Sequence, residues 1–310
     1  MRIDRRHFLG GALALGAGAC IPPDQSPAGR LAAELRLIEA AGNGTLGAEL
    51  FDTVSGLSLG LNQHRRFGHA SSFKLSLAAL LLQRHAAGAI DADRRVTWGK
   101  ADMIAHAPFT TERMASGASL RELARATQIT SDNPAANILL RELGGPAALT
   151  AFWRSIGDEV SRLDRFEPEL NLVPPAEFRD TTTPAAMART VAKLVYGDVL
   201  PERERAELRG WMIATETGLR RVRAGLPEGW VVGDKTGSSG LVGSEYTFVD
   251  IGFAEGPKGQ SPITFACYFR ARKGEDDLWA RGELTLSRVG RVIKEFAEPE
   301  RGLPLVGKLY

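Results

Sequence analysis

Four short groups of residues in this chain combine side chains that could carry out acyl transfer. They are Ser71-Ser72-Phe73-Lys74, Ser131-Asp132-Asn133, Glu167-Pro168-Glu169-Leu170-Asn171 and Lys235-Thr236-Gly237. Each group alone is weak evidence. Together they supply a nucleophile, two groups that can take its proton, and donors for an anionic substrate. The four groups in this order predict an enzyme.

Ser71 and Lys74 lie three residues apart, which places them on one face of a helix. Leu75, Leu77 and Leu80 follow, so this helix is expected to be buried. Burial disfavours a charged lysine, and a neutral amine beside a hydroxyl can act as a base. Considered alone, a serine at a helix start is equally well explained as a helix cap.

The elements that must position these groups change in kind along the chain. Helical periodicity is predicted over 30–41, 72–85, 120–127, 134–143, 146–156, 184–195, 201–213 and 278–295. Strands are predicted over 45–52, 58–62, 230–234, 246–253 and 263–272. Residues 161–182 predict a long loop, and loops of that length are usually functional.

This order predicts an α/β (α+β) fold, in which an antiparallel five-stranded sheet flanked by helices carries an inserted all-helical domain. The active site is expected in the cleft between the two domains. We assign residues 30–62 and 215–299 to the α/β domain, and 63–214, including the 162–181 loop, to the all-helical domain. Residues 20–29 are expected to be a linker and 300–310 a C-terminal tail.

Residues 1–19 have the layout of an export signal rather than of a folded element. Arg5-Arg6-His7-Phe8-Leu9 resembles a twin-arginine signal, and the apolar stretch after it is too short for a permanent transmembrane helix. Ala17-Gly18-Ala19 fits cleavage, which predicts a periplasmic or otherwise exported protein. Cys20 follows directly, so a lipid anchor on Cys20 stays open as an alternative.

The composition excludes some classes of partner. The 310 residues carry a net charge of +2, and Arg2, Arg5 and Arg6 against Asp4 account for it, so the rest is neutral. A neutral chain does not suit nucleic acid, because phosphate binding needs a basic excess. Cys267 is expected to be buried without a disulfide. No Cys/His cluster has metal-ligand spacing, so we expect no metal and no cofactor, and a monomer.

Taken together, the four groups resemble the class A serine β-lactamases, which are related to penicillin-binding transpeptidases. The resemblance spans roughly residues 30–297. It includes the segments around the motifs, among them Asp132-Asn133-Pro134-Ala135-Ala136-Asn137, Arg165-Phe166-Glu167-Pro168-Glu169-Leu170-Asn171, Arg179-Asp180-Thr181-Thr182-Thr183-Pro184 and Gly233-Asp234-Lys235-Thr236-Gly237.

The resemblance implies a role for each residue. Ser71 would attack the carbonyl of a small-molecule β-lactam, with Lys74 helping to move its proton and Ser131 protonating the departing nitrogen. Glu167 would activate the water that hydrolyses the acyl-enzyme, and whether Lys74 or Glu167 is the acylation base stays open. The implied substrate-binding residues are Asn133, Asn171, Lys235, Thr236, Gly237 and Ser238, with an oxyanion hole from the backbone N–H groups of Ser71 and Ser238.

The presence of Glu167 and Asn171 distinguishes an enzyme that hydrolyses its acyl-serine from a protein that only becomes acylated. They lie four residues apart on one loop and can share one water, which turns a trapped acyl-serine into a turnover enzyme. A loop glutamate alone is more often simply solvated. The resemblance further implies that an Arg165–Asp180 ion pair pins the ends of this loop.

Arg221 is a candidate for binding the substrate carboxylate, because a guanidinium suits a carboxylate. Some family members place this arginine on the strand after K-T-G, where Ser244-Glu245-Tyr246-Thr247 supplies none. Arg221 aligns with the alternative position, and a solvated helix arginine is the competing interpretation. Ala70 and Ser239 stand where many class A carbapenemases have two cysteines, which weighs against carbapenem hydrolysis.

Two alternatives use the same serine. A DD-peptidase, or penicillin-binding protein, would share the serine and lysines but would not need Glu167 and Asn171. A β-lactam sensor would become acylated and stay acylated. The sequence favours the hydrolase, since both loop residues are present.

Overall fold

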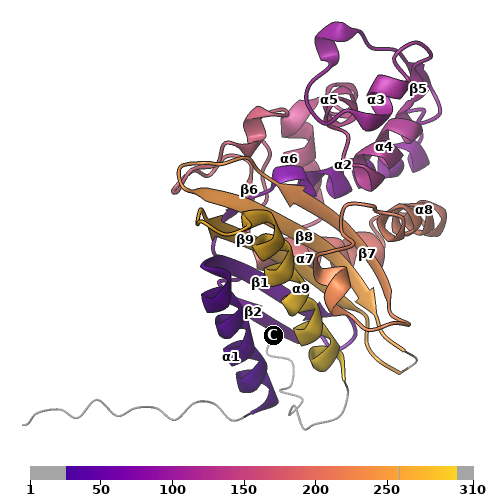
Figure 1. The fold of residues 1–310 in the computed structure, drawn as a ribbon. Helices are drawn as coiled ribbons and strands as arrows, with labels where there is room; N and C mark the ends of the chain where they lie inside the picture. Colours follow the sequence, from indigo (N-terminus) through magenta and orange to yellow (C-terminus); the bar gives the residue numbers. More distant parts are fainter. Residues whose placement is uncertain (1–25, 258, 299–310) are drawn as a thin grey trace, which may run out of the picture.

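A five-stranded antiparallel sheet forms the centre of the protein, in the strand order β2-β1-β9-β8-β7 (Figure 1). The computed structural model describes residues 26–257 and 259–298, so the expected signal, Cys20 and the tail lie outside the described residues. The strands are β1 Gly44–Asp52, β2 Ser58–Leu61, β7 Val231–Ser238, β8 Glu245–Glu255 and β9 Ile263–Arg272. The predicted antiparallel five-stranded sheet is confirmed.

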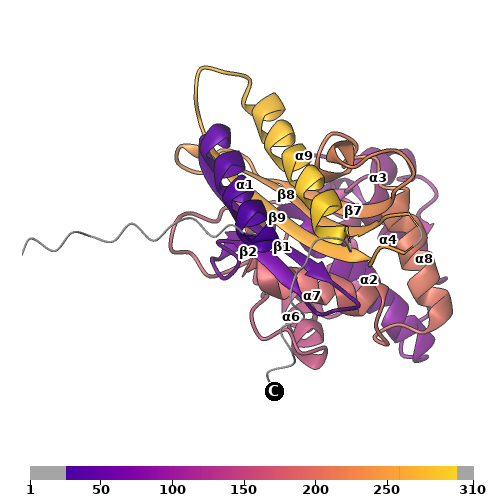
Figure 2. The same cartoon turned by 90° about the horizontal axis from the view of Figure 1, so that it is seen from below.

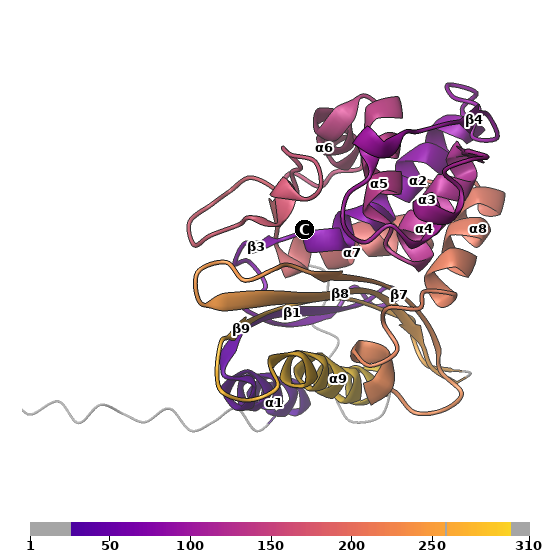
Figure 3. The same cartoon turned by 45° about the horizontal axis from the view of Figure 1, so that its top comes forward.

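Helices cover both faces of this sheet (Figures 2 and 3). Helices α1 (Pro27–Gly42) and α9 (Leu278–Ala297) pack together on one face. The alternation of β9 explains the two layers, because Phe265 and Phe269 belong to the α1/α9 core while Ala266 and Tyr268 belong to the core of the helical side.

The opposite face carries the remaining helices. They are α2 Phe73–Ala86, α3 Pro108–Glu112, α4 Leu120–Ile129, α5 Asn133–Glu142, α6 Gly145–Ser155, α7 Pro184–Val195 and α8 Glu202–Ile213, with short 3₁₀ turns at Ala70–Ser72, Lys100–Asp102 and Glu169–Asn171. A further 3₁₀ turn, Val222–Gly225, packs against α9 on the other face. α2 is central to this layer, since every residue from Phe73 to Leu82 is buried. α7 lies directly on β1, β8 and β9.

Two short strand pairs complete the helical side. β3 (Phe67–Gly68) pairs with β6 (Thr181–Thr182), and β4 (Arg95–Val96) pairs with β5 (Ala118–Ser119). The first pair brings the end of the 161–182 loop to the segment that leads into Ser71. The predicted domain boundaries at 62/63 and 214/215 stay a prediction.

Two element bounds differ from those expected by more than two residues. The expected linker ends earlier, because Ser26 caps α1 by accepting from Gly29 N at 3.0 Å and Pro27 occupies the first turn. β7 continues to Ser238, four residues beyond the expected strand end, since its backbone pairs with β8 throughout. K-T-G therefore lies within a strand.

Cys267 is buried and makes no disulfide. Burial raises the pKa of its thiol well above the ordinary value. Within residues 26–257 and 259–298, no helix is both long and apolar enough to cross a membrane.

Candidate active site

Ser71 lies in the 3₁₀ turn Ala70–Ser72, where the chain turns from β3 into α2. Ala70 has a φ of 43°, in the left-handed region that a non-glycine residue seldom occupies. Such strain is often found at functional sites. The hydroxyl of Ser71 accepts from Lys74 Nζ at 3.0 Å, and the turn shows no side-chain cap. The capping interpretation of Ser71 is therefore wrong.

Lys74 is completely buried and sits between three segments. Its Nζ donates to Ser131 O at 2.8 Å and to Asn133 Oδ1 at 2.5 Å, and lies 3.3 Å from Glu167 Oε1. Burial lowers the pKa of Lys74, while the charges of Glu167 and Asp132 oppose that shift. The Lys74 amine can thus exchange a proton with the Ser71 hydroxyl or with the Glu167 carboxylate.

Ser131 and Asn133 reach the site because Asp132 fixes the turn between α4 and α5. The buried Asp132 carboxylate caps α5 by accepting from Ala135 N at 2.9 Å, and it also accepts from Thr110 N at 3.0 Å. Ser131 itself has a φ of 64°. Its hydroxyl accepts from Lys235 Nζ at 3.1 Å, so two lysines converge on one serine.

The long loop delivers Glu167 into the same space. Its carboxylate is almost fully buried, and Asn171 Nδ2 donates to Glu167 Oε2 at 2.6 Å. The side chain of Asn137 on α5 forms two hydrogen bonds with the backbone of Glu167, at 2.8 and 3.0 Å. Asn137 was overlooked as a positioning residue, although it lies in the quoted segment Asp132–Asn137.

The two ends of this loop are tied together by Asp180. Its buried carboxylate accepts from Asp164 N at 2.7 Å, from Arg165 N at 3.0 Å and from Arg165 Nε at 2.5 Å. The Arg165 side chain is one-fifth exposed, so this is a partly buried pair rather than a surface one. The expected ion pair is present.

β7 runs beside Ser71 at Gly237. A Cβ atom on Gly237 would lie 2.9 Å from Ser71 N and 3.0 Å from Ala70 Cβ, so no side chain fits there. Thr236 Oγ1 lies 2.5 Å from Thr217 Oγ1. Lys235 is fully buried, and its pKa falls well below the ordinary value through burial and the nearby charges of Lys74 and Arg221.

Arg221 is buried, so it is not a solvated helix arginine. Its guanidinium donates to Gly237 O at 2.7 Å, Val249 O at 2.6 Å and Ser238 Oγ at 2.7 Å. Burial lowers the pKa of Arg221, and the charge of Asp250 opposes this most strongly. Asp250 on β8 was not expected from the sequence, because a strand aspartate alone gives no sign of its buried partner.

These residues surround one cleft of about 380 Å³. Its lining includes the predicted Ser71, Ser131, Asn133, Glu167, Asn171, Arg221, Thr236, Gly237 and Ser238. Lys74 and Lys235 do not line it but lie buried against the hydroxyl of Ser131. The structure adds Thr217, Trp279 and Glu283 to the lining, and also His106, to which the sequence assigned no role. Within residues 26–257 and 259–298, no three His, Cys, Asp or Glu side chains are grouped so that they could hold a metal ion.

Comparisons with known proteins agree with this geometry. Residues 30–297 match the model of the "Beta-lactamase enzyme family". β-Lactamase L2 of Stenotrophomonas maltophilia is 42% identical over 304 residues, covering 94% of this chain and 98% of that protein. β-Lactamase FAR-1 of Nocardia farcinica is 49% identical over 205 residues, 66% of each chain.

Solved structures give the same result. An ancestral class A β-lactamase superposes with a TM-score of 0.81 at 43% identity, covering 86% of this chain and 99% of that one. A β-lactamase from Xanthomonas campestris gives a TM-score of 0.82 at 38% identity, covering 87% of this chain and 98% of that one. The chain therefore belongs to the β-lactamase enzyme family and is a class A serine β-lactamase.

Proposed function

We propose that Ser71 is the nucleophile with which this β-lactamase opens the β-lactam amide of penicillins and cephalosporins. As a class A enzyme it hydrolyses that amide and gives resistance to β-lactam antibiotics. The observation that carries the assignment is the position of Lys74 Nζ, 3.0 Å from Ser71 Oγ and 3.3 Å from Glu167 Oε1. A nucleophile with two proton acceptors in reach can be activated without a metal.

Acylation forms a bond between Ser71 Oγ and the lactam carbonyl carbon and breaks the lactam C–N bond. The serine proton passes to Lys74 or Glu167. Ser131 relays a proton to the departing nitrogen, because its hydroxyl gives up its own proton and takes another from Lys74 Nζ, 3.4 Å away. The backbone N–H groups of Ser71 and Ser238 are the proposed oxyanion hole. The close approach of β7 to the Ser71 turn supports this pairing.

Deacylation needs a water directed at the new ester. Asn171 Oδ1 is a buried acceptor without a hydrogen-bond partner among the described residues, and the buried Glu167 Oε1 has only its ion-pair contact with Lys74 Nζ at 3.3 Å. Both residues line the cleft beside Ser71. We assign them the role of holding this water, with Glu167 as its general base.

The substrate carboxylate is assigned to the positive side of the cleft. Thr236 and Ser238 offer hydroxyl groups there. The buried side chains of Lys235 and Arg221 supply positive charge close to these hydroxyl groups. Asn133 is proposed to bind the substrate side-chain amide. Its Nδ2 already donates to Ala105 O at 2.9 Å, which fixes its orientation.

Turnover of a chromogenic cephalosporin, combined with intact mass, tests the scheme. Wild type should turn over rapidly, and Glu167→Ala should accumulate an adduct of substrate mass on Ser71. A wild type without turnover would overturn the proposal. An inactive Glu167→Ala variant without any adduct would contradict only the role of Glu167 in deacylation.

We also propose that residues 1–19 direct export to the periplasm by the twin-arginine route and that the mature protein is a monomer. Acylation of Cys20 is the alternative end point for the mature chain. Labelling with palmitate that disappears in Cys20→Ala would establish the anchor, and unlabelled protein in the soluble fraction would exclude it. Size-exclusion chromatography with light scattering checks the monomer.

A further inference from the structure

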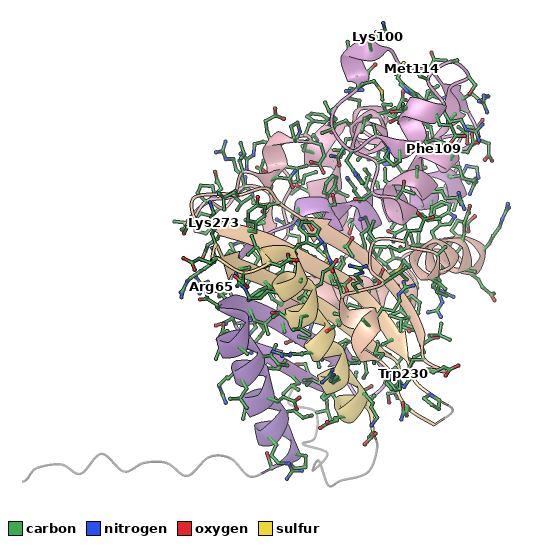
Figure 4. The ribbon with its side chains drawn as sticks, viewed as in Figure 1. Arg65, Lys100, Phe109, Met114, Trp230 and Lys273 are labelled. Carbon is green, nitrogen blue, oxygen red and sulfur yellow. The ribbon has the colours of Figure 1, made fainter. Side chains whose placement is uncertain are left out.

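A second cavity, of about 300 Å³, shares no lining residue with the cleft that holds Ser71. Three parts of the chain form it. Residues 65–68 precede the nucleophile turn, residues 173–178 belong to the long loop, and Thr247 and Arg270 are cross-strand partners on β8 and β9. The cavity is thus bounded by the loop that carries Glu167 and by the edge of the fold where Arg65 lies (Figure 4).

Three guanidinium groups line this cavity, from Arg65, Arg66 and Arg270. Arg66 donates to Val160 O at 3.0 Å and to Thr181 Oγ1 at 3.1 Å, which anchors one end of its fork. The Arg270 side chain is only 14% exposed, and its guanidinium lies 5.4 Å from the centre of the Phe67 ring. These two arginines are therefore held in place before any ligand arrives.

The acidic residues nearby leave this charge largely unbalanced. Glu177 lines the cavity, but its carboxylate already accepts two bonds from Arg179, at 2.6 and 3.0 Å. Glu245 forms a long ion pair with Arg270 at 3.8 Å, too far for a hydrogen bond. No side-chain ion pair is found for Arg65 among the described residues. Burial lowers the pKa of Arg270, the charge of Glu245 opposes this shift, and the charge of Arg65 adds to it.

The remaining walls are apolar, from Phe67, Val173, Pro174, Pro175 and Phe178. Arg66 lies 5.6 Å from the ring centre of Phe178, so one wall is also a cation–π partner. A guanidinium fork matches the paired oxygens of carboxylate and phosphate groups. A cavity this size holds more than a single small ion.

We propose that this cavity binds a small multivalent oxyanion, carrying phosphate or carboxylate groups, between Arg65, Arg66 and Arg270. The anion would join residues 65–68 to residues 173–178 by charge-assisted hydrogen bonds. Because Asn171 lies just before that loop segment, occupancy would steady the part of the loop that adjoins Glu167.

Two-dimensional amide NMR of the intact protein tests this site separately from the cleft. Inorganic phosphate and citrate are the two probes, each titrated against sodium chloride of matched ionic strength. Saturable shifts of the amides of Ala176, Glu177 and Phe178 support the site, and the tighter probe identifies the ligand class. Shifts at Thr236 and Ser238 report binding in the catalytic cleft instead.

Arg65→Gln and Arg270→Gln should each weaken the loop-site affinity about tenfold, the loss of one charge-assisted contact. Lys273→Gln is the matched control, since Lys273 is exposed at the same edge of the molecule but does not line the cavity (Figure 4). Its affinity should stay within about twofold of wild type. Arg65 is exposed, so its variant keeps the test valid if Arg270→Gln fails to fold.

The proposal is overturned if neither probe shifts the loop amides saturably at concentrations up to about 50 mM, where only millimolar or tighter sites fill. An equal loss of affinity in Lys273→Gln and Arg65→Gln would also overturn it, because the binding would then reflect general surface charge rather than this cavity.

Discussion

Lys74 Nζ lies 3.3 Å from Glu167 Oε1, and both side chains are buried, at 0% and 1% exposure. A helix and a loop that are far apart in sequence thus place an amine and a carboxylate beside one serine. The pair can hold one proton between them, so removing either partner leaves the other buried and unpaired. Substitution of Lys74 and substitution of Glu167 should nevertheless block different steps of the reaction.

We expect Lys74→Ala to slow acylation by roughly 10²- to 10⁴-fold, the usual effect of losing a positioned proton acceptor. Little adduct should accumulate, in contrast to Glu167→Ala. Stopped-flow acylation with intact mass at timed quenches measures this. Lys100→Ala, an exposed lysine outside the cleft, serves as the control. A trapped adduct in Lys74→Ala would show that the lysine acts in deacylation instead.

Arg221→Gln should raise KM for substrates that carry the ring carboxylate and lower kcat/KM by about 10- to 100-fold, since a charged hydrogen-bond partner is lost. The buried Asp250 carboxylate would also lose its main cationic neighbour, so the melting temperature should fall. Arg220→Gln is the matched control, because that side chain is 83% exposed. Equal kinetics in the two variants would contradict the substrate-binding role.

Gly237→Ala should reduce kcat strongly, because its Cβ would contact the backbone of the Ser71 turn at 2.9–3.1 Å. The shift needed to relieve this contact would displace the proposed oxyanion donors, whose loss typically costs about 10²-fold or more. Gly240→Ala is the control, since nothing lies within 4 Å of a Cβ there. Steady-state kinetics with burst-phase acylation give the answer. An active Gly237→Ala would argue against tight packing of β7 on the turn.

Asp180→Asn should lower the free energy of unfolding by about 3 kcal/mol, because Arg165 and two backbone N–H groups lose a buried carboxylate. Deacylation should slow as the loop loosens. Glu177→Gln removes the more exposed pair with Arg179, so the free energy of unfolding should change much less than in Asp180→Asn. Urea unfolding and adduct lifetime test both variants. Similar stability losses would mean that Asp180 does not anchor the loop.

His69 makes stability depend on pH. It is fully buried and stacked on Trp153 with ring centres 4.9 Å apart, and burial lowers its pKa from 6.5 to about 4. The unfolded chain then binds the proton more tightly, so stability is complete above about pH 6.5 and is lost as the pH falls towards 4. His69→Phe should keep the stacking on Trp153 and remove this loss of stability at acid pH. At full effect the difference in the free energy of unfolding is about 3 kcal/mol.

Urea unfolding of wild type and His69→Phe at several pH values between about 4.5 and 7.5 measures the difference between their free energies of unfolding. Taking the difference cancels the contributions of the carboxylates. A constant difference across this range would show that His69 does not titrate as its buried setting requires.

Local patterns predicted most of the fold, since short apolar runs bounded by turn residues mark the strands and 3.6-residue periodicity marks the long helices. The two element ends that differ from the expected bounds have causes that the pattern within one segment does not show. β7 reaches Ser238 because β8 pairs with it, and pairing is not visible in the residues of one strand. The start of α1 at Pro27 depended on the cap from Ser26.

The sequence by itself determined the chemical inventory: a serine and a lysine at helical spacing, a loop carboxylate with an amide four residues later, and a lysine-threonine-glycine segment. Only the tertiary structure decided that Lys74 lies between Ser71 and Glu167, that Arg221 is buried and bonded to Gly237 O, and that Asn137 holds Glu167. The charge state of a side chain, and the groups that it can contact, depend on burial and on contacts between distant segments. Neither is a property of the residues in sequence, because both arise only when the helical layer closes on the sheet.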